Sequence, residues 1–441
     1  MPLATPAAAG RTAAAPRPMT ECPAQLFLPA PATLSRGASA FLSGTRLPQP
    51  PSPATLSESA DPTAQARRAA EARRDAERQR AKDAAAWKLP SERYRAVYVM
   101  RHEVTSLGGV QSVLAEPRPG LRADGRPAGG VGSPAADNSS ALLFFHGGGY
   151  RLGDPRAMFF AFAPLAAAAA LPAYAPAYRL APEHPFPAAL DDALAAYSAL
   201  IRRVDPARVA LAGDSAGGGL AAALLLRAAG EGLPLPGAAV LFSPWAVLKG
   251  GVTDTSVTLC CADPMLNPDA LAAAGKLYAG NASADDPLLS PAFGDYGAAR
   301  AKARGGRFPP VLITCGTREV LLSDAVLLRH RMRAGGVDAS ISPYEGMWHS
   351  FNSRGSPGAL DLPEAAAVIT EAAEFIRKHI PHRQGGVGGV GGAASGSDGT
   401  EGGGSSGTAS GGGGGGGVEG SSRGGGNSSS GGLGAKAPGA R

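Results

Sequence analysis

The sequence predicts an α/β protein whose central sheet is mostly parallel and carries helices on both faces. One observation is that short apolar runs alternate with helical stretches between residues 94 and 380, which is typical of a parallel sheet covered by helices. A second is that both ends of the 441-residue chain are strongly biased in composition, so that only the middle can bury a core. We therefore expect one folded domain over residues 61–383.

The two terminal segments, residues 1–60 and 384–441, are predicted to lie outside that domain. The first is rich in Ala, Pro, Ser and Thr, has few acidic residues and carries scattered arginines. This composition suits an organelle transit peptide or a disordered extension. The last segment is mainly Gly, Ser, Ala and Thr, with too few large apolar side chains to offset the entropy of ordering. We expect it to be a disordered tail.

Strands are expected in the following order. An antiparallel hairpin at the sheet edge comes first, with residues 94–104 and 110–115 on either side of Gly108 and Gly109. Buried strands follow at residues 141–145, 172–178, 209–212, 238–242, 311–314 and 339–344.

Helices are expected at residues 158–170, 188–203, 217–229, 322–333 and 363–379. The last of them repeats apolar residues at the spacing of a core-facing helix. Residues 159–178 are nearly all apolar and long enough to cross a bilayer, but three prolines interrupt them. A buried crossover helix that leads into a buried strand explains this segment better, so no membrane span is expected.

Two segments, at about residues 61–90 and 249–286, do not belong to the alternation of strands and helices. Residues 62–87 read as a solvated helix, since basic and acidic side chains alternate three or four positions apart. The second segment is an insertion after the strand at 238–242. Together they suit a small helical cap over an active site, with peripheral decoration as the alternative.

Composition excludes several classes of function. The net charge is only +6, and the basic residues do not gather in one patch with aromatics, so a nucleic-acid partner is not expected. Four cysteines at irregular positions fit neither a disulfide framework nor a metal site, which favours a reducing compartment and no metal. No apolar leader opens the chain, and we expect an intracellular protein, either cytoplasmic or plastid.

Ser215 is the candidate nucleophile. It lies in Gly213-Asp214-Ser215-Ala216-Gly217, between an apolar strand and a predicted helix. The same pattern surrounds Ser405 and Ser422, but there it lies in the Gly-rich tail without a strand or helix beside it. At a sharp turn the glycines leave room for a strained serine, and the following helix directs backbone N–H groups at the developing negative charge.

A glycine turn, His146-Gly147-Gly148-Gly149, directly follows the strand at 141–145. Consecutive glycines let backbone N–H groups point at one spot, where they can bind an oxyanion beside the N–H of Ala216. The turn lacks the Lys-Ser/Thr pair of a phosphate loop and the spacing of a dinucleotide fingerprint. His146 itself is predicted to be a structural histidine of the turn.

His349 is the candidate general base. In hydrolases whose nucleophile lies on such a turn, the acid and then the histidine follow later in the chain. After Ser215 the remaining histidines are His330, His379 and His382, which lie in or at the end of helices, and His349, which follows the last strand in a loop.

Two carboxylates compete for the role of the acid. Glu319 lies in the loop after the strand at 311–314, whereas Asp324 already lies in the next helix. We prefer Glu319, because it is nearer the strand end and its longer side chain can reach the far nitrogen of His349. Near a helix start, the carboxylate of Asp324 is stabilised by the helix dipole whether or not it serves catalysis.

These residues together resemble the hormone-sensitive-lipase-like branch of the α/β-hydrolases, from about residue 142 to residue 351. Three motifs carry the resemblance: HGGGY from His146, GDSAGG from Gly213, and YRLAPEHPFPA at residues 178–188. It implies the α/β-hydrolase fold with a small helical cap. It also implies a triad of Ser215, Glu319 and His349 and an oxyanion hole of Gly147, Gly148 and Ala216.

The sequence departs from the pattern of this family at two places. Glu319-Val320-Leu321 stands where most members have Asp-Pro-Leu, which keeps Asp324 open as the acid. Ser350 stands after the histidine where many members have glycine, a change that could alter the substrate pocket.

The predicted function is serine-dependent hydrolysis of small to medium acyl esters through an acyl-enzyme intermediate, with no cofactor. The expected partner is a small-molecule ester. Amide or formamide hydrolysis, or deacetylation, on the same site is one alternative, because such machinery does not by itself choose the leaving group. A non-catalytic ligand receptor built on the fold is the other, and the presence of His349 argues against it.

Overall fold

The computed structural model describes residues 34, 35, 38, 42, 62–128, 139–248, 263–353 and 362–381. The predicted tail at 384–441 lies outside the described residues, as do Ser405, Ser422, most of residues 1–60 and residues 249–262 of the predicted insertion. Of the N-terminal extension, Ser35 contacts the domain, since its N–H and Oγ donate to the Glu364 carboxylate at 2.7 and 2.8 Å.

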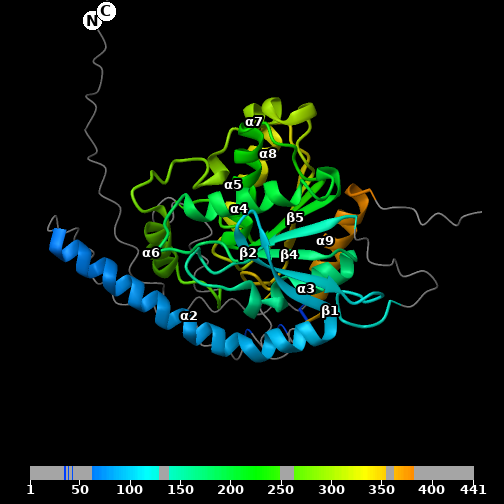
Figure 1. Ribbon diagram of the computed structural model, residues 1–441, viewed down its shortest axis with the longest axis horizontal. Coiled ribbons are helices and arrows are strands. Elements are labelled where there is room, and N and C mark those ends of the chain that lie inside the picture. The colour runs from blue at the N-terminus through cyan, green and yellow to red at the C-terminus, as the bar shows by residue number, and fades with distance from the viewer. Residues whose placement is uncertain are drawn as a thin grey trace, which may run out of the picture. The chain divides into compact units, whose positions relative to one another are not determined.

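Eight strands of the described chain form one sheet. They are β1 (Val99–Leu107), β2 (Val110–Pro117), β3 (Ala141–Phe145), β4 (Ala173–Pro176), β5 (Val209–Asp214), β6 (Ala238–Phe242), β7 (Val311–Gly316) and β8 (Ala339–Tyr344). Their order in the sheet is β1-β2-β4-β3-β5-β6-β7-β8 (Figure 1). Strand β2 is antiparallel to both of its neighbours, β1 and β4, and all other pairs are parallel. The predicted mostly parallel sheet is therefore confirmed.

Helices cover both faces of the sheet. The α-helices of the described residues are α2 (Pro62–Tyr98), α3 (Phe159–Ala169), α4 (Ala188–Leu200), α5 (Ala216–Gly230), α6 (Pro268–Ala279), α7 (Tyr296–Lys302), α8 (Leu322–Ala334) and α9 (Pro363–His379). Residues of α3 and α9 share one hydrophobic core, and residues of α4, α5 and α8 share the other. No helix among the described residues is long and apolar enough to cross a membrane.

Strand β3 shows why the central strands are apolar at every position. Successive side chains of a strand point to opposite faces of the sheet. Leu142 and Phe144 accordingly lie in the core with α3 and α9, whereas Leu143 and Phe145 lie in the core with α4 and α5. Because helices bury both faces, every residue of β3 is 0% exposed.

The predicted first strand of the hairpin was wrong at its beginning. Helix α2, expected over residues 62–87, continues through Pro90 to Tyr98, so that β1 begins only at Val99. Tyr94 and Tyr98 are four residues apart on one helix face and stack at 5.7 Å between ring centroids. Tyr94 also packs edge-on against Phe160 of α3. These packing contacts keep the two tyrosines in the helix, although tyrosine has a high propensity for strands.

Two helices were not predicted as separate elements. Helix α6 lies inside the predicted insertion at 249–286. Its N-cap is Asn267, whose side chain accepts the N–H groups of Asp269 and Ala270. Helix α7 has only seven residues and no apolar periodicity by which the sequence could reveal it. Asp295 caps it by accepting the N–H of Ala298.

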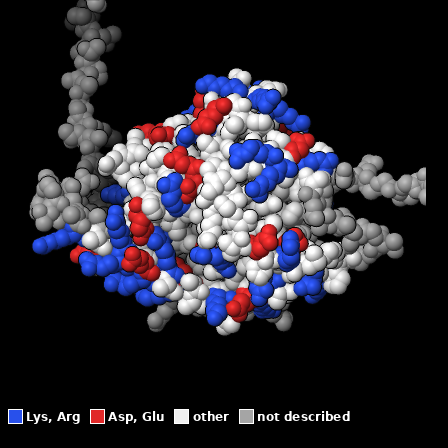
Figure 2. All heavy atoms as spheres, in the orientation of Figure 1, with Lys and Arg blue, Asp and Glu red and all other residues white. Residues whose placement is uncertain are grey.

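Basic and acidic side chains are interspersed on the face of the molecule in Figure 2. One ion pair, between Arg80 and Glu183, fixes the position of helix α2. Arg80 of α2 donates to the carbonyl oxygens of Arg151 and Ala181, both at 2.7 Å, and binds the Glu183 carboxylate through two bonds at 2.8 and 3.0 Å. One guanidinium thus holds α2 against two loops that follow β3 and β4.

We expect Arg80→Ala to lower the free energy of unfolding by about 2 kcal/mol, because it removes charged hydrogen bonds that are only partly exposed to water. Burial tends to raise the pKa of Glu183, but its bonds with Arg80 outweigh burial and hold the pKa below its usual range. A depressed carboxylate pKa gives stability that is present above the unfolded-state pKa and is lost as the pH falls through the folded-state pKa. The difference in Tm should therefore be present at neutral pH and shrink in acid.

The matched control is Arg78→Ala on the same helix. Arg78 pairs with Asp75, but the two side chains are 68% and 62% exposed, so this pair should contribute almost nothing. Equal Tm losses for the two variants would contradict a docking role for Arg80.

Candidate active site

Ser215 lies at the sharp turn between β5 and α5, with a backbone φ of 57° and ψ of −121°. A side chain at Gly213 would overlap the backbone of Gly217, and one at Gly217 would overlap the carbonyl oxygen of Phe145. Both glycines are therefore required for the close approach of α5 to the ends of β3 and β5. The strained φ at a non-glycine residue is held by a hydrogen bond from the Ser215 N–H to the Phe242 carbonyl, at 2.9 Å.

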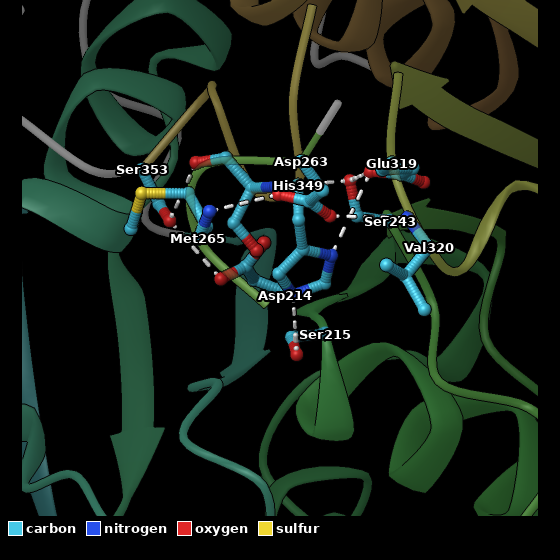
Figure 3. Close-up of polar contacts among 10 residues, drawn as sticks. Asp214, Ser215, Ser243, Asp263, Met265, Glu319, Val320, His349 and Ser353 are labelled. Carbon is cyan, nitrogen blue, oxygen red and sulfur yellow. Dashed lines mark hydrogen bonds and ion pairs between the residues drawn. The ribbon is translucent and has the colours of Figure 1, made fainter. Parts of the chain in front are cut away.

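The loop after β8 brings His349 to the serine. Its Nε2 lies 2.8 Å from Ser215 Oγ, although the two residues are 134 positions apart in the sequence (Figure 3). His349 is 1% exposed and Ser215 is 7% exposed, so the pair is almost entirely shielded from bulk water. This is the geometry of a nucleophile and its base.

Glu319 lies on the opposite side of the imidazole. Its Oε2 is 3.6 Å from Nδ1 of His349, somewhat longer than a hydrogen bond, as often occurs in sites without substrate. The carboxylate is 0% exposed and accepts a bond of 2.6 Å from Ser243 Oγ. Burial raises the pKa of Glu319, and the Ser243 hydroxyl, which favours the ionised carboxylate, opposes this rise.

Asp324 has a different environment. It lies in the first turn of α8, and its Oδ2 accepts the backbone N–H groups of Ala246 and Val247 at 2.9 and 2.8 Å. Its carboxylate thus supports the loop after β6. Of the two carboxylates that the sequence left in competition, the structure brings Glu319 to the far nitrogen of His349.

Ser243 is a functional residue that the sequence analysis missed. It directly follows β6, has a positive φ of 43°, and bridges two loops of the site. Its Oγ donates to Glu319 and accepts the N–H of Ser350 at 3.2 Å. A serine after an apolar strand is too common a feature to have indicated this role.

The glycine turn after β3 lies against the nucleophile. A Cβ added to Gly147 would lie 3.1 Å from Cβ of Ser215, and Gly148 has a φ of 115° that other residues rarely adopt. Ala216 is the first residue of α5, where N–H groups have no acceptor within the helix. Gly147 and Ala216 therefore both lie beside Ser215, and Gly148 follows Gly147 in the same turn.

His146 has the structural position that the sequence predicts. Its ring is 1% exposed, stacks on Tyr178 with centroids 4.4 Å apart, and places Nδ1 2.7 Å from the Gly147 carbonyl. Burial lowers its pKa to about 4, so the ring is neutral at pH 7. Tyr178 in turn donates to the carbonyl oxygen of His146 at 2.7 Å.

Helix α6 packs on the far side of the glycine turn. Tyr278 stacks on Tyr150, the residue after the glycines, with centroids 3.7 Å apart and planes within 2°. Trp245 and Phe186 extend this aromatic cluster. Within the part of the chain that the structure describes, no group of three or more His, Cys, Asp or Glu side chains could hold a metal ion.

Comparisons with known proteins identify the family of this fold. A family model described as the alpha/beta hydrolase fold matches residues 142–353. An acetyl-hydrolase of Streptomyces hygroscopicus is 37% identical over 249 residues, which cover 55% of this chain and 77% of that protein.

Two solved structures are similar over most of their length. A hormone-sensitive lipase from a metagenome library is 33% identical with a TM-score of 0.57, covering 68% of this chain and 92% of that one. An esterase from the bacterial hormone-sensitive lipase family is 34% identical with a TM-score of 0.54, covering 64% and 85%. The fold and the site define an α/β-hydrolase. Within that class, the chain belongs to the esterases of the hormone-sensitive lipase family.

We expect Glu319→Gln to lower kcat by about three to four orders of magnitude, because the amide keeps the shape but loses the charge that orients and stabilises the imidazolium. Asp324→Asn should leave kcat of the folded protein near that of the parent. Since it disturbs a buried acceptor of two N–H groups, it should cost about 1–3 kcal/mol of stability. Steady-state kinetics and thermal unfolding separate the two effects, and the opposite outcome would exchange their roles.

Ser243→Ala should lower kcat/KM roughly ten- to a hundredfold, the equivalent of one lost hydrogen bond to a charged group. Because the hydroxyl favours ionised Glu319, its removal raises the pKa of that carboxyl further. The acid limb of the pH profile should move to higher pH. Ser342→Ala is the control, since Ser342 also donates to a glutamate, Glu371, at 3.0 Å. A profile that does not move would contradict the coupling of Ser243 to Glu319.

Proposed function

We propose that the chain is a serine carboxylesterase in which Ser215 is the nucleophile, His349 the general base and Glu319 the acid of the triad. The observation that carries the proposal is the 2.8 Å contact between Ser215 Oγ and His349 Nε2 at a strained strand-to-helix turn. Membership of an esterase family supports the reaction class.

In the first half of the reaction, His349 Nε2 takes the proton of Ser215 as Oγ attacks the carbonyl carbon of the ester. The carbonyl oxygen becomes an anion that the N–H groups of Gly147, Gly148 and Ala216 stabilise. Glu319 holds the Nδ1 proton and stabilises the imidazolium. The intermediate then collapses, the alcohol leaves with the proton from Nε2, and the acyl group remains on Ser215.

In the second half, a water molecule gives its proton to Nε2 and attacks the acyl carbon. The second tetrahedral anion uses the same N–H groups, and its collapse returns the proton to Ser215 Oγ and releases the carboxylic acid. These steps use only side chains and backbone N–H groups of this chain.

Small to medium acyl esters are the proposed substrates. The similarity to an acetyl-hydrolase supports the short end of this range. The hydrogen bond between Ser215 and His349 favours an enzyme over a non-catalytic ligand receptor, which would not need a base beside the serine.

We expect the protein to hydrolyse p-nitrophenyl acetate and butyrate, and to lose turnover in Ser215→Ala with an unchanged far-UV spectrum and Tm, since only one hydroxyl is removed. A fluorophosphonate should label Ser215 alone, as checked by mass spectrometry of the peptides. The matched p-nitroanilides test amide hydrolysis. Faster anilide than ester turnover, or labelling at Ser405 or Ser422, would overturn the proposal.

A further inference from the structure

Asp263 is a buried carboxylate that the proposed reaction does not use. It is 0% exposed and lies in the stretch that leads into α6, within the predicted cap insertion. One oxygen, Oδ1, accepts the N–H of Met265 at 2.9 Å, in a local turn. The other, Oδ2, accepts the N–H of Val320 at 3.0 Å, a contact between residues 57 positions apart.

The bond to Val320 concerns the triad because Val320 directly follows Glu319. The loop after β7 thereby has an anchor on each side: Ser243 binds the side chain of Glu319, and Asp263 binds the backbone beside it. A buried carboxylate is costly unless hydrogen bonds and a nearby positive charge compensate for the lost water. The two N–H groups supply the first of these.

The second compensation comes from the catalytic base. Burial raises the pKa of Asp263, and the charge of His349 acts in the opposite direction. In Figure 3 the imidazole lies between Ser215 on one side and the carboxylates of Glu319 and Asp263 on the other. Three groups interact with His349 itself: Ser215, Glu319 and Asp263. Asp214, Ser243 and Cys315 interact with Glu319, Ser350 with Ser243, and Ser353 with Asp214.

We propose that Asp263 is a positioning residue for this reaction: from the cap insertion it fixes the loop of Glu319 and places a second negative charge beside the imidazolium of His349. The proposal rests on the function proposed above. The local turn at Met265 alone would be an ordinary structural feature. The long-range bond and the proximity to the base link the insertion to the chemistry.

Removal of the negative charge of Asp263 should lower the pKa of His349. A negative charge near the imidazolium favours the protonated base, so its loss makes the base give up its proton at lower pH. The acid limb of kcat/KM belongs to the coupled group of His349, Glu319 and Asp263 and should move to lower pH. Loss of the Val320 anchor should lower kcat as well, because a small displacement of the acid weakens its hold on the base.

The experiment compares the parent, Asp263→Asn and Asp324→Asn on p-nitrophenyl acetate across the pH range in which the parent is stable. Asp324 is the matched control, since it too is a buried aspartate that accepts two backbone N–H groups. We expect Asp263→Asn to shift the acid limb down by about one pH unit and to lower kcat about tenfold with little change in KM. Asp324→Asn should lower Tm without moving the limb.

An unshifted acid limb in folded Asp263→Asn would overturn the proposal, as would a shift of the same size in Asp324→Asn. Asp263→Glu provides a second test if the amide variant does not fold. It keeps the charge and moves the anchor, so the limb should stay while kcat falls, and an unchanged kcat would refute the anchoring role. A parent without esterase activity would refute the proposed function instead, which is a distinguishable failure.

Discussion

The close approach of α5 to the carboxyl ends of β3 and β5 is the constraint on which the rest of the site depends. Gly213 and Gly217 permit it, because a Cβ at either position would overlap neighbouring backbone. The approach brings the first turn of α5 and the glycine turn after β3 to the same side of Ser215. The strained φ of Ser215 follows from the same packing, which places this residue directly before the N-terminus of α5.

Burial then determines the electrostatics. Glu319, Asp263 and Asp214 are all less than 4% exposed, and three buried carboxylates around one imidazole would repel one another strongly in an apolar medium. Hydrogen bonds offset part of this repulsion. Ser243 donates to Glu319, Ser353 donates to Asp214, and the backbone N–H groups of Met265 and Val320 donate to Asp263. In the proposed reaction, the imidazolium of His349 would supply the remaining compensation. The negative surroundings would then favour the charged base of the transition state.

Much of this arrangement can be predicted from local pattern. β3, β6 and β8 have the predicted bounds, and for β3 and β6 the reason is that both faces of the strand are buried. Ser215 and His349 could be found from the elements that flank them. Ser243 and Asp263 could not be found, since each acts on a residue far away in the sequence, and only the packed fold brings the partners together. The end of α2 was mispredicted for a related reason. Tyrosine has a high strand propensity, but Tyr94 packs against Phe160 of α3 and stacks on Tyr98 in a helical conformation.

The two segments that interrupt the alternation of strands and helices attach to the domain through different physical interactions. The end of helix α2 packs against α3 through Tyr94, but its middle is held at the surface by Arg80, whose bonds to Glu183 and to two carbonyl groups remain partly open to water. The insertion is attached through buried contacts: Asp263 accepts the N–H of Val320, and Tyr278 stacks on Tyr150 beside the glycine turn. A change in the surface contact alters how firmly a helix is docked, and salt screens it. In the proposal above, a change at Asp263 alters the charge around His349. The insertion, more than α2, is then the segment through which sequence variation can adjust the chemistry.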